Sequence, residues 1–424
     1  MLEEILDRRN IEKALVQVES NKGAAGIDNM QWSELRSYIN TQWQAIRQSI
    51  LESNYEPNPV RKVEIPKPQG GKRMLGIPTV VDRMLQQAIA QWLTPMYEAE
   101  FSKRSYGFRP NRNAHQAVLQ AAQYLNEGKV WVIELDLENF FDKVNHDRLM
   151  STLSKKITDK RTLKLIRSYL TSGIMEGGVI STRSEGTPQG SPLSPLLSNI
   201  VLDELDKELE KRNHSFVRYA DDVSIYLSSE TSARRVMTGI TKYIEGKLLL
   251  KVNKDKTNVS KPEVSVLLGF SFRQYKGKWI IKIARKSADR IKHKLKAITL
   301  RSKSISESER IAKLNTIIRG WVNYFVIAMA KSRMQHLDGT VRNRLRMCKW
   351  KQWKAAQTRR VNLLKLGVSS RDAYHHGGSG AGYCRVARSY ILCKALPDAY
   401  FKKQGYVGFS ELYYRLTEKQ TSLF

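Results

Sequence analysis

Two adjacent aspartates, Asp221 and Asp222, are the residues whose type and spacing most directly suggest chemistry. They stand between two apolar runs, residues 215–219 and 223–227, whose composition is typical of β-strands. The sequence therefore predicts a tight hairpin turn that carries two carboxylates. Such a pair either decorates a solvated hairpin or holds a divalent cation, and the pair alone does not decide between the two.

A third carboxylate follows another apolar run, residues 131–135, at Asp136. Two-metal phosphoryl transfer uses carboxylates that converge from different strands, because two Mg²⁺ ions must bridge nucleophile, phosphate and leaving group. One acid from this strand and two from the hairpin turn would satisfy that requirement. Spacing alone leaves three other nearby acids open as the third member, namely Glu138, Asp142 and Asp147.

A basic hairpin and a helix precede these strands. An extended run from Val60 to Pro66, a turn over residues 67–72 and a return run through Ile77 predict the hairpin. Cations on a hairpin suit a triphosphate, although exposed lysines there are more often only solubilising. The cations are Arg61, Lys62, Lys67, Lys72 and Arg73. The next segment predicts a helix that begins at Thr79. Its buried stripe would be Leu85, Ala88, Ile89 and Trp92.

The charge of the chain indicates its partner. The chain has 424 residues, of which 41% are apolar, and a formal net charge of +31. This length is enough for two or three domains with substantial cores. So large a positive charge is costly in a compact fold unless a polyanion neutralises it, and we therefore expect nucleic acid as the partner. Residues 285–365 hold 22 Lys or Arg against 4 Asp or Glu and are the main basic segment.

Other signals concern location and cysteine chemistry. The first residues are acidic, where a signal peptide would begin basic and then turn apolar. The sequence has no apolar run of the roughly 20 residues that span a bilayer, so we expect no membrane partner and a cytoplasmic location. Three scattered cysteines suit a reducing compartment. Without a C-x-x-C pair, we interpret Cys348, Cys384 and Cys393 as core thiols rather than zinc ligands.

Three ordered blocks of this sequence resemble those of group II intron reverse transcriptases, which are also called maturases. Tyr219-Ala220-Asp221-Asp222 matches the polymerase palm signature, and the segment from Asp136 to Asp142 matches the palm block before it. The segment from Thr187 to Ile200 matches the block between them. Further agreement comes from residues 21–28, 105–110 and 267–270. The resemblance therefore runs from about residue 21 to about residue 354.

The resemblance implies an α+β fold. It is that of a right-hand polymerase with fingers and a palm built on an antiparallel sheet, followed by an α-helical thumb and a small C-terminal DNA-binding domain. The expected boundaries are 1–60 for an N-terminal region that contacts RNA, 61–284 for fingers and palm, 285–366 for the thumb, and 367–424 for the DNA-binding domain. Some family members continue into a Cys/His metal-dependent endonuclease domain, whereas this sequence ends at Phe424 with no such cluster, so the resemblance is to the shorter type that lacks this domain.

The resemblance also assigns the catalytic residues. It implies that Asp136, Asp221 and Asp222 bind two Mg²⁺ ions, so we expect metal and nucleotide, rather than a lysine, as their partners. Ala220 would leave room at the primer end. Ser191 departs from the family pattern, because members usually have a second glycine there, and the change could alter backbone freedom beside the nucleotide.

Further residues are implied for the nucleotide and the primer. Arg61 and Lys67 would contact the triphosphate, Phe141 would pack under the deoxyribose and exclude a 2′-hydroxyl, and Gln189 would line the nucleotide pocket, whereas Phe140 would pack in the palm. The primer grip would be Leu267, Leu268, Gly269 and Phe270. Leu267 or Phe270 could equally be simple strand core.

The basic segment resembles the maturase thumb. Its candidates for phosphate contacts are Arg342, Arg346, Lys349 and Lys354. Its aromatic residues Trp321, Phe325 and Trp353 recur at helical spacing, and we interpret them as core.

The function implied is that of an RNA-directed DNA polymerase that extends a DNA primer on an RNA template with dNTPs. Target DNA and intron RNA are further expected partners, the latter for splicing and retrohoming. Two alternatives remain open. One is a domesticated polymerase in DNA repair or phage defence, and the other is an RNA-binding splicing factor with a vestigial polymerase site.

Overall fold

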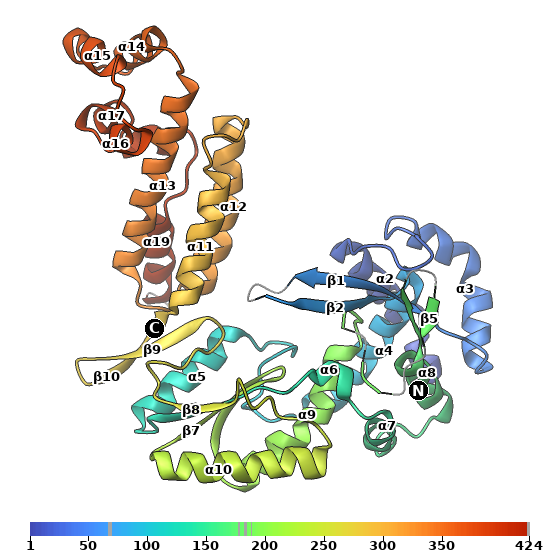
Figure 1. Ribbon diagram of the computed structural model, residues 1–424. Coiled ribbons are helices and arrows are strands. Elements are labelled where there is room, and N and C mark those ends of the chain that lie inside the picture. Colours follow the sequence, from blue (N-terminus) through green and yellow to red (C-terminus); the bar gives the residue numbers. More distant parts are fainter. Residues whose placement is uncertain (67–69, 177–178, 182–184, 188, 422–424) are drawn as a thin grey trace. The chain divides into compact units, whose positions relative to one another are not determined.

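The chain divides into two compact units in a computed structural model that describes residues 1–66, 70–176, 179–181, 185–187 and 189–421. The units are Met1–Lys261 and Pro262–Phe424 (Figure 1). The division falls earlier than the boundary expected after residue 284. The reason is that the strands of residues 270–283 belong with the helices that follow them: the ring of Phe270 lies 4.9 Å from that of Phe325.

The first unit combines helices with two four-stranded sheets. Its helices are α1 (Leu2–Ile5), α2 (Arg8–Asn21), α3 (Leu35–Leu51), α4 (Val80–Glu98), α5 (Ala114–Asn126), α6 (Phe140–Lys143), α7 (His146–Ser154), α8 (Lys160–Thr171), α9 (Ser194–Lys211), α10 (Glu230–Tyr243) and the π-helix η1 (Ile244–Leu248). Helix α4 begins as predicted, because the Thr79 hydroxyl accepts a hydrogen bond from the backbone N–H of Asp82 at 3.1 Å. Its predicted stripe is core, with Leu85, Ala88 and Ile89 buried and Trp92 half-buried.

The predicted basic hairpin is present in the first sheet. The strands of this sheet are β1 (Val60–Pro66), β2 (Lys72–Ile77), β4 (Ile174–Glu176) and β5 (Val179–Ser181), in the order β2-β1-β4-β5. Strands β1 and β2 pair antiparallel, whereas β1 and β4 pair parallel. Only the ends of the hairpin nearest its base are shielded from solvent.

The second sheet is antiparallel throughout and is more deeply buried. It contains β3 (Trp131–Leu135), β6 (Ser215–Tyr219), β7 (Asp222–Leu227) and β8 (Asn258–Ser260), in the order β6-β7-β3-β8. Helices α5, α9 and α10 pack on it (Figure 1). Strands β6 and β7 are buried over most of their length, so both faces of this part of the sheet are covered.

The second unit is mainly helical. It opens with the antiparallel hairpin of β9 (Phe270–Tyr275) and β10 (Lys278–Ile283). Its helices are α11 (Arg285–Ile298), α12 (Glu307–Phe325), α13 (Lys331–Gln352), α14 (Ala356–Lys365), α15 (Ser370–Gly377), α16 (Tyr383–Ala387), α17 (Tyr390–Ala395), α18 (Asp398–Lys403) and α19 (Phe409–Thr421). The predicted aromatic core is largely confirmed, with Phe325 and Trp353 buried and Trp321 half-buried.

Helix α19 returns to pack on α12 and α13. The carboxylate of Asp338, on α13 and only 3% exposed, holds the start of this helix. It accepts hydrogen bonds from the backbone N–H of Phe409 at 2.7 Å and of Ser410 at 2.8 Å, and from the Tyr406 hydroxyl at 3.0 Å. The last described helix is therefore fastened to the middle of the basic segment.

Two expectations about the whole chain can be compared with the structure. In the described part of the chain, no helix is long and apolar enough to cross a membrane. The interpretation of the cysteines as core thiols is right for Cys348, which is buried, but wrong for Cys384, which is exposed on α16. Cys393 is half-buried.

Candidate active site

The acidic hairpin forms from β6 and β7, with Tyr219 paired to Asp222 across it. Only Ala220 and Asp221 therefore lie in its loop, as in other two-residue hairpin turns. Strand β7 begins one residue before the predicted apolar run, at Asp222 itself. The two carboxylates thus stand at the end of the buried sheet.

Strand β3 carries Asp136 to the same end of the sheet. It pairs antiparallel with β7, and Leu135 lies opposite Val223. One further residue along each strand places Asp136 beside Asp222. Of the acids left open by spacing, Asp147 lies 81% exposed in an ion pair with Arg167. Strand register therefore brings together Asp136, Asp221 and Asp222.

The pKa values of the hairpin acids reflect this crowding. Burial, with a contribution from the charge of Asp136, raises the pKa of Asp221 above its usual value. Crowding by protein atoms, and then the charges of Asp221 and Asp136, raises the pKa of Asp222 to about 6, although this residue is exposed to solvent. A bound cation would thus stabilise the charged form of both carboxyl groups.

The expectation that these acids lack a lysine partner is wrong. Lys256 Nζ lies 3.1 Å from Asp136 Oδ2. The cause is the pairing of β8 with β3, because the turn that leads into β8 lies against Asp136: the backbone N–H of Asn253 donates to the Asp136 carbonyl at 2.9 Å. The Lys256 side chain is 64% exposed, so this ion pair is weak and a cation could displace it.

The donor set suits Mg²⁺ in chemical type, because Mg²⁺ prefers carboxylate oxygens. Burial, and after it the charge of neighbouring acids, raises the pKa of both Asp221 and Asp222. Among the described residues, however, no three His, Cys, Asp or Glu side chains stand in an arrangement that could hold a metal ion without moving. Binding of Mg²⁺ here would require a small rearrangement, such as release of Asp136 from Lys256.

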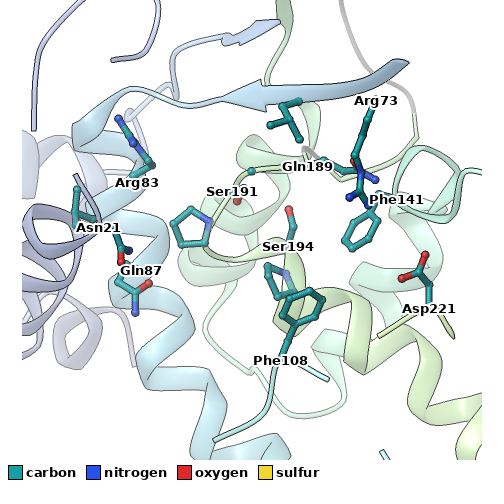
Figure 2. Close-up of a pocket in the computed structure, with 15 residues that line it drawn as sticks. Asn21, Arg73, Arg83, Gln87, Phe108, Phe141, Gln189, Ser191, Ser194 and Asp221 are labelled. Atoms are coloured by element: carbon teal, nitrogen blue, oxygen red, sulfur yellow. The ribbon is translucent and has the colours of Figure 1, made fainter. Parts of the chain in front are cut away.

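A cavity of about 490 Å³ opens beside Asp221. Figure 2 shows Arg73, Gln189 and Phe141 on the side of this cavity nearest Asp221. Arg73 Nε donates to Gln189 Oε1 at 2.8 Å, and the Gly76 N–H donates to the Gln189 carbonyl at 2.8 Å. The segment that carries Gln189 is therefore fastened to β2 of the basic hairpin.

The structure treats the predicted nucleotide residues differently. Phe141 and Gln189 line the cavity, whereas Arg61 and Ala220 are not among its described lining residues. Arg61 is half-buried on β1, and its Nε has no hydrogen-bond partner in the described part of the chain. Lys67 lies outside the described residues. Arg73 lines the cavity instead. Leu75, two residues later on β2, lines it too, because side chains two positions apart point to the same face of a strand.

The far side of the cavity is polar and was not predicted. Asn21 on α2 and Arg83 and Gln87 on α4 lie there (Figure 2). Arg83 is nearly buried, its Nη2 donates to the Ala24 carbonyl at 2.6 Å, and burial lowers its pKa. Only the apolar stripe of this helix was predicted, but the spacing of four between Arg83 and Gln87 places both on one helix face and could have indicated a polar face.

Ser191, the departure from the family pattern, lies within the cavity wall. Its hydroxyl donates to Gln86 Oε1 at 2.5 Å and accepts from the Leu193 N–H at 3.3 Å. Gln86 is buried on α4. The serine therefore ties this segment of the cavity wall to a core helix, and its effect is to restrict the backbone there.

The residues expected to form the primer grip make a tight turn in the second unit. Leu267 and Phe270 exchange two backbone hydrogen bonds, and Leu268 and Gly269 between them have φ values of 50° and 82°. Leu267 and Phe270 are buried, so they also have the core role left open above. The Tyr324 hydroxyl donates to the Leu268 carbonyl at 2.8 Å.

Most of the cations expected to contact phosphates have partners within the protein. Arg342 Nε lies 2.7 Å from Asp398 Oδ1, Arg346 Nε donates to the Leu396 carbonyl at 2.9 Å, and Lys349 pairs with Glu307. These contacts hold α18 and α12 against α13. Lys354 is exposed. Exposed cations that were not singled out lie on α11, namely Arg285, Lys286, Arg290, Lys292, Lys294 and Lys296.

Comparison with known families agrees with the order of these elements. Residues 65–272 match the family of reverse transcriptases (RNA-dependent DNA polymerases). Residues 288–367 match the maturase-specific domain of group II introns. The second match covers nearly the same residues as the basic helical segment.

Relatives agree with both matches. The chain is 34% identical to protein YkfC of Escherichia coli (strain K12) over 280 residues, which is 57% of this chain and 74% of that protein. It is 40% identical to the group II intron-encoded protein LtrA of Lactococcus lactis subsp. cremoris over 163 residues, 38% of this chain and 27% of that protein. A putative COX1/OXI3 intron 2 protein of Saccharomyces cerevisiae is 28% identical over 324 residues, 62% of this chain and 37% of that protein. The chain belongs to the family of group II intron reverse transcriptases and maturases.

Proposed function

We propose that this protein is an RNA-directed DNA polymerase that extends a DNA primer on an RNA template. The observation that carries the proposal is the register of β3, β6 and β7, which gathers three carboxylates beside a cavity of nucleotide size. The membership of the family supports the same reaction. In it, the primer 3′-oxygen forms a bond to the α-phosphorus of a dNTP, and pyrophosphate leaves.

Asp136, Asp221 and Asp222 would hold two Mg²⁺ ions. When bound, Mg²⁺ supplies charge neutralisation at the phosphates and a more acidic 3′-hydroxyl. The carboxylates fix where that charge lies, and their placement at the end of a buried sheet keeps them from shifting with solvent. Lys256 balances the charge of Asp136 when the site holds no cation.

The cavity residues would position the nucleotide. Phe141 is buried in the wall and offers a flat apolar surface for the deoxyribose, against which a 2′-hydroxyl would clash. Gln189 is oriented by Arg73, and Arg73 would in addition contact the triphosphate, together with Arg61 and Lys67 of the same hairpin. Ala220 is small and adjoins Asp221, which leaves space for the primer end.

The second unit would bind nucleic acid. The excess of cations in residues 285–365 favours a polyanion. The cations of α11 are exposed, and the ion pairs of Arg285 and Lys292 with Asp289, at 3.9 Å and 3.5 Å, are longer than that of Arg342 with Asp398 at 2.7 Å. In this proposal α11–α13 form a thumb, Leu267 to Phe270 form the primer grip, and residues 367–424 contact target DNA. The match to a maturase-specific domain supports binding of intron RNA and assistance to its splicing.

Primer extension on an RNA template tests the proposal. We expect Asp221→Ala to abolish synthesis, because it removes one of the acids that the metal requires. Asp147→Ala is the matched control, since Asp147 is an exposed aspartate of the same unit. Undiminished synthesis by Asp221→Ala would contradict the two-metal assignment.

Splicing can be separated from synthesis. A group II intron RNA should bind Asp221→Ala as tightly as the parent and splice with it, because the exposed cations of the second unit are unchanged. Loss of both activities in this variant, with an unchanged melting temperature, would mean that one site serves both.

A further inference from the structure

A fully buried arginine lies one residue before the acidic turn. Arg218, on β6, is 0% exposed, and so is its partner Asp206 on α9. Arg218 Nε donates to Asp206 Oδ1 at 2.8 Å and Nη2 donates to Asp206 Oδ2 at 2.6 Å. A buried pair of this kind seldom stabilises a fold more than apolar residues of the same volume would. Its presence beside the acids therefore requires another explanation.

The remaining nitrogen of the guanidinium connects this pair to the turn. Arg218 Nη1 donates to the carbonyl of Ala220 at 2.9 Å and to Asn199 Oδ1 at 2.9 Å. Asn199 Nδ2 in turn donates to the Gly107 carbonyl at 2.9 Å. One side chain thus joins α9 to the residue directly before Asp221.

The backbone of the turn needs such support. Ala220 has a φ of 58°, in the left-handed region that disfavours any residue with a side chain. On the other side of the turn, Gly107 packs so closely that a Cβ on it would overlap the backbone nitrogen of Ala220. The Tyr106 N–H donates to the Arg218 carbonyl at 2.8 Å. The turn is therefore held between α9 and the segment around Gly107.

We propose that Asp206, Arg218 and Asn199 form a positioning network that holds the Ala220–Asp221 turn in its metal-binding conformation before metal or nucleotide arrives. The inference rests on the proposed function, because it concerns the same site. Arg218 acts through the backbone of Ala220, so it is a positioning residue. A displacement of about 1 Å at such a site can lower a reaction rate by about a hundredfold.

The decisive variant removes the network and keeps the volume. In Asp206→Leu/Arg218→Met both charges are replaced by apolar side chains, so the fold is retained while the bond to Ala220 is lost. We expect an unchanged melting temperature, faster hydrogen exchange of residues 217–223 in the metal-free protein, and Mn²⁺ binding weakened by about tenfold, measured by electron paramagnetic resonance. Primer extension should fall by at least the same factor.

A second pair of variants, each with a conservative substitution, tests the network even if the double variant does not fold. Arg218→Lys keeps the charge opposite Asp206 but cannot reach Asp206, Asn199 and Ala220 together. Its match is Arg310→Lys, which alters another buried arginine that binds carbonyl oxygens, those of Leu300 and Lys303 in the second unit. Only Arg218→Lys should weaken Mn²⁺ binding. If Mn²⁺ affinity and exchange at the turn match the parent in both Arg218 variants, the network is structural only.

The readouts keep the two proposals apart. Hydrogen exchange and Mn²⁺ binding report on the turn without any synthesis. A parent protein that binds Mn²⁺ but does not extend primers would contradict the proposed function. The network would then still be tested by the Mn²⁺ affinity of the variants. Normal synthesis and Mn²⁺ affinity in the double variant would overturn the network alone.

Discussion

Two hairpins face the same cavity region of the first unit and are held in opposite ways. The acidic hairpin β6–β7 is buried along nearly its whole length and rests on the network of Arg218. The basic hairpin β1–β2 becomes exposed toward its turn, and its ion pairs lie in solvent: Lys62 with Glu176 at 2.7 Å and Lys72 with Glu64 at 2.5 Å. Exposed pairs of this kind contribute about 0–1 kcal/mol each.

The difference separates two tasks. If the acids hold Mg²⁺ as proposed, they must stand within a fraction of an ångström of their places, which the end of a packed sheet provides. A triphosphate carries its own charge to the protein, and cations on an exposed hairpin can adjust to it. Substitutions that disturb the packing around the acidic hairpin should therefore reduce primer extension far more than substitutions on the surface of the basic hairpin.

The largest effect is expected at Gly107. In Gly107→Ala the new methyl group must displace the backbone of Ala220, because no flexible side chain is there to yield. We expect single-turnover primer extension to fall by about a hundredfold. Gly246→Ala, whose methyl group meets open space, is the control and should extend primers as the parent does. Equal rates for the two variants would mean that the turn tolerates movement.

A smaller effect is expected at the basic hairpin, where two neighbouring cations differ. Arg73 faces the cavity and holds Gln189, so Arg73→Ala should raise the KM for dNTP by about tenfold, the loss expected for one charge-assisted hydrogen bond. Lys72 is 71% exposed and pairs with Glu64 at the surface, so Lys72→Ala should leave the KM unchanged. Steady-state kinetics decide, and equal KM values would remove Arg73 from the nucleotide site.

The pH dependence tests the crowding of the acids. The pKa of Asp222 is raised to about 6, so below that pH a proton competes with the metal. The Mg²⁺ concentration needed for half-maximal extension should fall as pH rises from about 5 to about 7, and then level off. In the metal-free protein the raised pKa means that stability is lost as pH rises from about 4 to about 6. Mg²⁺ should therefore raise the melting temperature more at neutral than at acidic pH, and an effect independent of pH would contradict the crowding.

The smallest effect is expected from Lys256. Lys256→Met removes the exposed cation that competes for Asp136, so the Mg²⁺ requirement should fall, by no more than about twofold. High salt should reduce the difference between variant and parent, because it screens an exposed pair. A rise in the Mg²⁺ requirement would show instead that Lys256 assists the bound nucleotide.

Much of the acidic site could be predicted from the sequence, because its signals are local. Apolar runs around Asp221 and before Asp136 specify strands, and the short gap between residues 219 and 223 specifies the hairpin. The helix that begins at Thr79 could be predicted in the same way, from its N-cap residue and the apolar stripe along one face. Phe141 and Gln189 came from matching motifs, and both line the cavity.

The missed residues depend on contacts between distant segments. Lys256 reaches Asp136 across 120 positions through the pairing of β8 with β3, and nothing near either residue indicates it. Arg342 and Lys349 lie in a strongly basic segment of the sequence, but in the structure they form ion pairs with Asp398 and Glu307. Arg218 was the exception that sequence could have revealed, because a charge inside an apolar strand requires a buried partner.

The attachment of α19 to Asp338 determines where this protein can be shortened. Gly367 marks a change in composition, and a protein ending at residue 366 would appear to contain the polymerase and its basic helices intact. Such a protein would lack Tyr406, Phe409 and Ser410 and so leave Asp338 a buried carboxylate without its hydrogen-bond donors. Removal of residues 367–424 would therefore damage the middle of the helical unit, and a shortened protein that keeps its fold should need a neutral residue at position 338.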